Sequence, residues 1–134
     1  MKTFKATIFS ALVAVLMFAC KSKTNPADDV EAIKFKFTEL GRQTQFRMIC
    51  NKFDFYFPEA KEKHFDKKPG IDSVMQLLTN LKVVNDGTEP DVRGKIYITH
   101  TGKVVDTVCV GVKLLNYKGA VYETPQELLA LIQK

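Results

Sequence analysis

The stretch KIYITHTGKVVDTVCVGV, residues 95–112, decides the fold class. Residues 95–100 alternate polar and apolar side chains, which is typical of a β-strand with one buried face. Residues 103–112 are apolar on both faces over most of their length, which favours a strand in the middle of a sheet. Thr101 and Gly102 lie between the two runs and supply a tight turn. The stretch therefore predicts an antiparallel hairpin at the centre of a sheet.

Similar patterns on either side of this hairpin predict further strands. Alternating apolar side chains predict strands over residues 33–37 and 46–57, the second with a bulge at Asn51-Lys52 that resets its phase. The segments LLNY (114–117) and AVYE (120–123) predict a short hairpin that turns at Lys118-Gly119. The charged run at 58–70 ends in Pro-Gly and predicts a loop.

Two helices complete the expected domain. Apolar residues recur at helical spacing from Ile71 to Leu81, with Asp72 as the expected N-cap. Residues 125–133 predict a C-terminal helix, with Thr124 as N-cap, Pro125 at the first helical position and Glu127 completing a capping box. The order β-β-α-β-β-β-α predicts an α+β domain, with a single antiparallel sheet of about five strands and both helices on one face.

The N-terminal residues 1–19, MKTFKATIFSALVAVLMFA, have the parts of a secretory signal peptide. Lys2 and Lys5 form a basic start, and residues 6–19 form an apolar run that is too short to cross a bilayer as a helix. The run ends at Cys20. We therefore expect residues 1–19 to be a signal peptide, 20–29 a tether and 30–134 a single domain.

The segment LMFAC, residues 16–20, resembles the lipobox of bacterial lipoproteins, in its loose Bacteroidetes-type form. The strict form has Leu at −3 and a small residue at −2, where this chain has Met17 and Phe18. The resemblance implies cleavage before Cys20, lipid on that cysteine and an outer-membrane protein that faces the periplasm. An ordinary signal peptide followed by a chance cysteine is the alternative.

The charge balance and the cysteines indicate which partners and which cellular compartment suit the protein. The net charge is +5, and loss of Lys2 and Lys5 leaves 18 basic against 15 acidic side chains, or +3 (18 − 15). We expect no nucleic-acid partner for such an exported protein. Cys50 and Cys109 would then be an even pair in an oxidising compartment, either bridged or buried as free thiols.

No residue pattern indicates a catalytic, metal or cofactor site. The only histidines, His64 and His100, lack metal-ligand spacing. The acidic run around Asp91 lacks the ligand density of a calcium loop, and Asp91 is expected to pair with Arg93. An enzyme would have to combine His64, His100 and Asp106 from separate loops.

The remaining candidates are contact residues for a partner. They are Tyr56, Tyr97, Tyr117, Lys61 and Lys63. The leading hypothesis is a lipid-anchored, non-enzymatic module that binds another envelope protein. The alternatives are an inhibitor or immunity protein against a toxin or hydrolase, a small enzyme, and an accessory subunit of a larger envelope complex.

Overall fold

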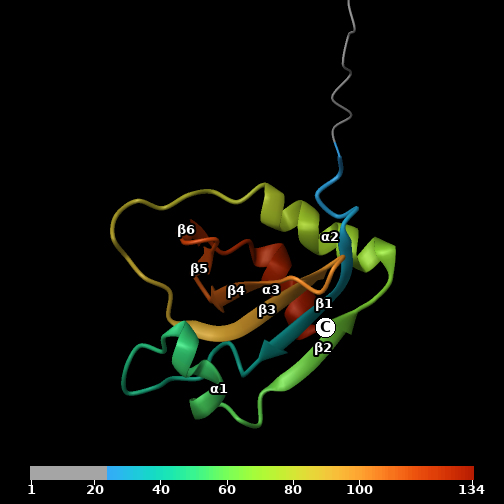
Figure 1. The fold of residues 1–134 in the computed structure, drawn as a ribbon. Helices are drawn as coiled ribbons and strands as arrows, with labels where there is room; N and C mark the ends of the chain where they lie inside the picture. Colours follow the sequence, from blue (N-terminus) through green and yellow to red (C-terminus); the bar gives the residue numbers. More distant parts are fainter. Residues whose placement is uncertain (1–23) are drawn as a thin grey trace, which may run out of the picture.

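A six-stranded antiparallel sheet organises residues 24–134, the part of the chain that this computed structural model describes (Figure 1). The strands are β1 (Val30–Phe37), β2 (Lys61–Phe65), β3 (Val92–His100), β4 (Val105–Gly111), β5 (Leu114–Tyr117) and β6 (Ala120–Glu123), in the order β2-β1-β3-β4-β5-β6. The helical segments are the 3-10 turn η1 (Cys50–Lys52), α1 (Phe53–Tyr56), α2 (Lys68–Thr79) and α3 (Gln126–Gln133). The predicted α+β class is confirmed, with six strands instead of about five.

The predicted central hairpin is confirmed as β3 and β4, which occupy the middle of the sheet. Ile96 pairs with Val108 across this hairpin, and both side chains are fully buried. The second predicted hairpin is β5 and β6. Lys118 and Gly119 both have positive φ there, as a two-residue turn between twisted strands requires.

The two longer helices cover one face of the sheet, which we call the first face. Ile33 and Phe35 of β1 point to this face. The apolar stripes of α2 and α3 pack there, as predicted. The buried residues that these helices contribute are Ile71, Val74, Met75, Leu78, Leu128, Leu129 and Ile132.

The opposite face, the second face, carries a smaller apolar cluster around α1, and here the sequence prediction was wrong. Residues 46–57 were expected to be strands, but they form a loop followed by η1 and α1. Phe53 and Phe57 lie one helical turn apart and are both buried against Val92 and Cys109. Phe55, which a strand would bury with them, is exposed. Three phenylalanines at positions i, i+2 and i+4 share one face of a strand, whereas in a helix only the i and i+4 pair shares a face, as Phe53 and Phe57 do here.

The charged segment 58–70 is also more structured than predicted. It contains the edge strand β2, whose residues 61–65 are mostly polar because an outer strand faces water and is protected from pairing by its charges. Pro69 and Gly70 do not close a loop; they lie in the first turn of α2. A Cβ on Gly70 would come within 2.7 Å of the Phe65 ring, so glycine permits this close contact with β2.

The predicted helix caps were wrong at both helices. Asp72 lies inside α2, where it pairs with Lys68 one turn earlier, and the helix ends at Thr79. Pro125 has an extended backbone and holds the N-cap position of α3. Thr124 donates its hydroxyl to the carbonyl of Gly111, so it joins β4 to the start of α3 and does not cap the helix.

Phe53 and Phe55 offer a matched test of the helical assignment. Phe53→Ala removes a fully buried ring and should lower the free energy of unfolding by about 3–5 kcal/mol. Phe55→Ala removes an exposed ring and should change it by less than about 0.5 kcal/mol. Urea unfolding of the two variants measures both values, and similar large losses would contradict the helix.

Candidate functional site

Three aromatic side chains are exposed together around α1, and we call them the aromatic patch. Phe55 is 77% exposed, Phe46 51% and Tyr56 46%. The Tyr56 ring lies 5.2 Å from Phe46 and 5.1 Å from Phe55, both in edge-to-face geometry. The rings therefore hold one another in a defined arrangement while their outer surfaces stay in water. Among residues 24–134 the other exposed large hydrophobics are Ile49, which precedes η1, and Val83, Val104, Val105 and Val112, which come from other segments.

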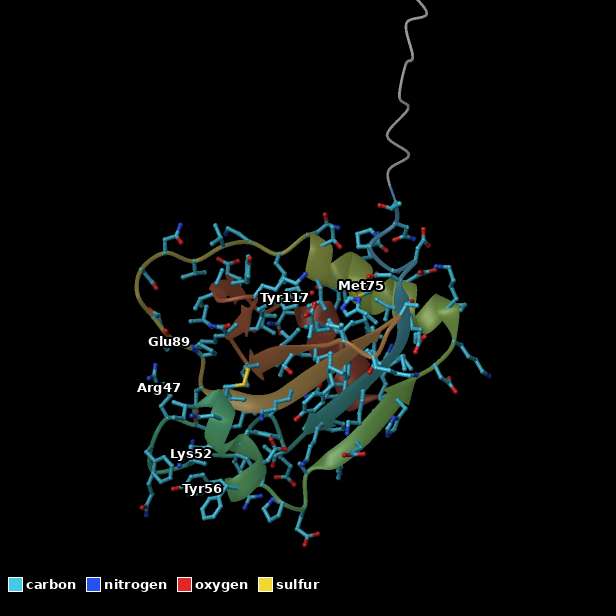
Figure 2. The ribbon with its side chains drawn as sticks, in the orientation of Figure 1. Arg47, Lys52, Tyr56, Met75, Glu89 and Tyr117 are labelled. Atoms are coloured by element: carbon cyan, nitrogen blue, oxygen red, sulfur yellow. A yellow bond between two sulfur atoms is a disulfide. The ribbon has the colours of Figure 1, made fainter. Side chains whose placement is uncertain are left out.

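A disulfide fixes the segment that carries the patch to the middle of the sheet. Cys50 in η1 is bonded to Cys109 in β4, with the two Cα atoms 5.6 Å apart (Figure 2). Cys109 is buried on the second face beside Phe53. Between the two alternatives that the sequence left open, the structure has the bridged form.

An ion-pair network attaches α1 to the sheet at a second point. Asp54 in α1 accepts hydrogen bonds from Lys36 Nζ of β1 at 2.7 Å and from Lys95 Nζ of β3 at 2.6 Å. Both lysines belong to the second face and are largely buried. The hydrogen bonds from Lys36 and Lys95 lower the pKa of Asp54 below its usual value, and the bond to Asp54 raises the pKa of Lys36.

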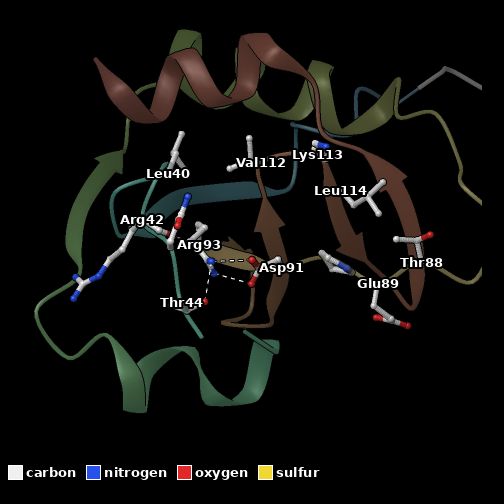
Figure 3. A pocket seen from close by; sticks show the side chains of 12 residues that line it. Leu40, Arg42, Thr44, Thr88, Glu89, Asp91, Arg93, Val112, Lys113 and Leu114 are labelled. Carbon is white, nitrogen blue, oxygen red and sulfur yellow. Dashed lines mark hydrogen bonds and ion pairs between the residues drawn. The ribbon is translucent and has the colours of Figure 1, made fainter. Parts of the chain in front are cut away.

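A cleft of about 450 Å³ lies beside this segment, and its floor is built on Arg93 (Figure 3). Arg93 is 4% exposed and donates from all three nitrogens: to both carboxylate oxygens of Asp91, to Thr44 Oγ1, and to the carbonyls of Arg42 and Val92. The expected Asp91–Arg93 pair is therefore present. All five N–H groups of Arg93 are used within the protein, so its role is to hold the loops together.

His100 lies between two carboxylates at the far end of the first face. Its Nδ1 is 3.0 Å from Asp29 Oδ2 and its Nε2 is 3.1 Å from Asp106 Oδ2. Tyr117 lines the adjoining cavity of about 730 Å³, and burial raises the pKa of its hydroxyl. Both ring nitrogens of His100 therefore face protein carboxylates in this structure.

The three residues of the enzyme hypothesis do not converge. His100 and Asp106 meet, but His64 pairs with Lys34 across β2 and β1 and faces the second side of the sheet. Among residues 24–134, no group of three or more His, Cys, Asp or Glu side chains is placed to hold a metal ion. No helix in the same described range is long and apolar enough to span a membrane.

The candidate contact residues are spread over the molecule, and only Tyr56 belongs to the aromatic patch. Tyr97 lies on the second face with Lys34 Nζ 5.1 Å from its ring centre, and Tyr117 lies on the first face. Lys63 donates to the carbonyl of Leu131 in α3, so it is already engaged. Lys61 is exposed at the start of the edge strand. The signal and lipidation predictions concern residues 1–19 and Cys20, which lie outside the described residues.

The sequence did not identify Phe46, Ile49 and Phe55 as surface residues. Alternating phenylalanines are typical of the buried side of a strand, so the sequence favours burial of Phe55. The spacing of Phe53 and Phe57 was the available signal for a helical turn, but one turn is too short to establish a helical period. Comparisons of the chain with protein-family models, curated proteins and solved structures gave no match.

The Asp54 network predicts a specific response to acid. The pKa of Asp54 is lower in the folded protein than in the unfolded chain, so its stabilisation is present above about pH 4 and is lost as the pH falls through the lowered value. Asp54→Asn should lower the free energy of unfolding at neutral pH by about 1 kcal/mol, the upper range for a partly exposed pair.

Urea unfolding of the wild type and Asp54→Asn between neutral pH and pH ~3 measures this effect. The difference between them should shrink below about pH 4, because protonation removes the same charge from the wild type. Asp66→Asn is a suitable control, since Asp66 is exposed and forms no ion pair among the described residues. A difference between the wild type and Asp54→Asn that stays constant with pH would contradict the network.

Proposed function

We propose that this chain is an exported, lipid-anchored protein of the cell envelope that acts without catalysis by binding another protein. The aromatic patch carries the binding part of this proposal. Isolated exposed hydrophobics are common on protein surfaces, but a contiguous group is characteristic of a contact site. Phe46, Phe55 and Tyr56 touch edge to face, so they form such a group.

The segment that carries the patch is firmly attached to the sheet, which supports a binding role for its exposed rings and argues against poor packing as the cause of their exposure. The same short segment buries Phe53 and Phe57, bonds Cys50 to β4 and pairs Asp54 with two strands. Aromatic side chains on a rigid support lose little conformational entropy when they bind, and such side chains dominate the binding energy of many interfaces. The side chains of the patch are therefore preorganised for binding in the free protein.

The anchoring part of the proposal rests on the N-terminal sequence alone. Lys2 and Lys5, the apolar run and Cys20 resemble a lipoprotein signal. A lipid on Cys20 would hold the domain at a membrane surface, facing the periplasm. A disulfide between Cys50 and Cys109 suits an exported protein, because thiols are kept reduced in the cytosol.

The intact mass of the membrane-extracted protein, alkylated without prior reduction, tests the anchor and the bridge together. We expect loss of residues 1–19, added acyl mass and no alkylation of Cys50 or Cys109. Alkylation after reduction should then modify both. A mass without lipid would contradict anchoring at Cys20, and alkylation of either thiol before reduction would contradict the bridge.

Site-specific photocrosslinking in the native cells tests the binding role. A photoreactive phenylalanine analogue at Tyr56 should give a crosslinked adduct with another protein, because Tyr56 lies within the patch. The same analogue at Gln133, an exposed position at the end of α3, should not give that adduct. Phe55→Ser should abolish the Tyr56 adduct while leaving the protein folded.

Equal crosslinking from both positions, or none to protein from Tyr56, would contradict the proposed function. An enzyme captured in stoichiometric amounts and inactivated by the purified protein would identify the inhibitor alternative.

A further inference from the structure

Three cations surround the aromatic patch and have no anionic partner in the described part of the protein. Arg42, Arg47 and Lys52 are exposed, and none of them forms an ion pair among residues 24–134. Figure 2 shows Arg47, Lys52 and Tyr56 gathered around α1. The Arg42 guanidinium also lies 5.4 Å from the ring centre of Phe57, next to the patch.

The local chain does not neutralise this charge. Between Leu40 and Pro58 the only acidic residue is Asp54, which is bound to both Lys36 and Lys95. Within residues 40–58, three cations that form no ion pair among residues 24–134 therefore stand against one carboxylate that is already bound. A partner with carboxylates at its rim would gain both attraction and orientation from these three cations.

We infer that the aromatic patch binds an acidic protein surface, in which an apolar pocket receives Phe55 and Tyr56 and carboxylates around it pair with Arg47 and Lys52. The inference rests on the proposed function and adds the chemistry of the partner. Aromatic and arginine side chains are the usual anchors of protein interfaces. Here the aromatic rings supply the apolar contact, and the cations at the edge select the partner by charge.

An anionic membrane would also attract aromatic and basic side chains, but the arrangement of the domain favours a protein. The described chain begins at the top of Figure 1 beside α2, whereas α1 lies at the bottom. A lipid attached before this point would place its membrane on the α2 side, away from the aromatic patch. The patch is also a cluster on one helical turn braced by a disulfide, unlike the long amphipathic helix that membranes usually bind.

A random peptide library displayed on phage is the probe for this inference. The membrane-extracted protein is immobilised, and peptides that also bind the Phe55→Ser/Tyr56→Ser variant are discarded. The remaining peptides should share Asp or Glu on either side of an apolar residue. Because the chain has no tryptophan, Tyr56→Trp supplies a unique fluorophore for measuring their affinity as salt rises to about 0.15 M.

Two variants with the same change in charge separate a local effect from a general one. Arg47→Glu/Lys52→Glu should weaken binding of the selected peptides by about tenfold or more, and binding to the wild type should weaken as salt rises. Lys67→Glu/Lys134→Glu alters exposed lysines outside the patch and should leave the affinity unchanged.

Three results of the peptide experiments would overturn the inference. They are a neutral or basic peptide consensus, the absence of any patch-dependent peptide, and equal loss of affinity in both charge-reversed variants. A blue shift in the fluorescence of the Tyr56→Trp variant on phosphatidylglycerol vesicles, without peptide binding, would also overturn it and assign the patch to lipid. Protein crosslinks from Tyr56 in cells, if they persist in Arg47→Glu/Lys52→Glu, would leave the proposed function standing while the charge inference fails.

Discussion

The buried guanidinium of Arg93 is the constraint on which the irregular half of the molecule depends. Its five donors reach Asp91, Thr44 and two backbone carbonyls, and the same Asp91 carboxylate accepts the amide of Met48 at 2.7 Å. One side chain of β3 thereby joins the loop after β1 to the segment that precedes β3. Because a buried cation with an unmet donor is costly, these loops have little freedom to rearrange without exposing it to water.

This constraint explains how a sheet with a well-packed first face can support an unusual second face. The first face is closed by α2 and α3 over a continuous apolar core. The second face receives only a short cluster, with Phe53 and Phe57 packed near Cys109. Such a small apolar contact holds a single helical turn because Arg93, Asp54 and the disulfide reinforce it. The aromatic patch is the outer surface of that reinforced turn.

The sequence predicts the regular elements well where one period dominates. The hairpin at 95–112 and the apolar stripe of α2 are unambiguous, because alternation and helical spacing each run for several residues. The segment around Phe55 is harder to predict, since its three alternating rings fit a strand. The spacing of Phe53 and Phe57 alone fits a helical turn, and their contacts with Val92 and Cys109 favour that turn. Tyr56 is identified as a contact residue from sequence. Phe46 lies next to Tyr56 only because the loop before η1 folds back on α1, and no local sequence pattern predicts the course of that loop. The partners of Asp54 are likewise distant in sequence and become visible only in the fold.

The position of the cysteines has a consequence for limited proteolysis. The bridge spans 59 residues, and the long exposed loop between α2 and β3 lies inside that span. A peptidase that nicks this loop would cut the backbone without separating the products, since the fragments on either side of the nick remain joined through Cys50 and Cys109. A nicked molecule would therefore keep its full mass on a non-reducing gel, retain β4 at the centre of the sheet and fall into two pieces only after reduction.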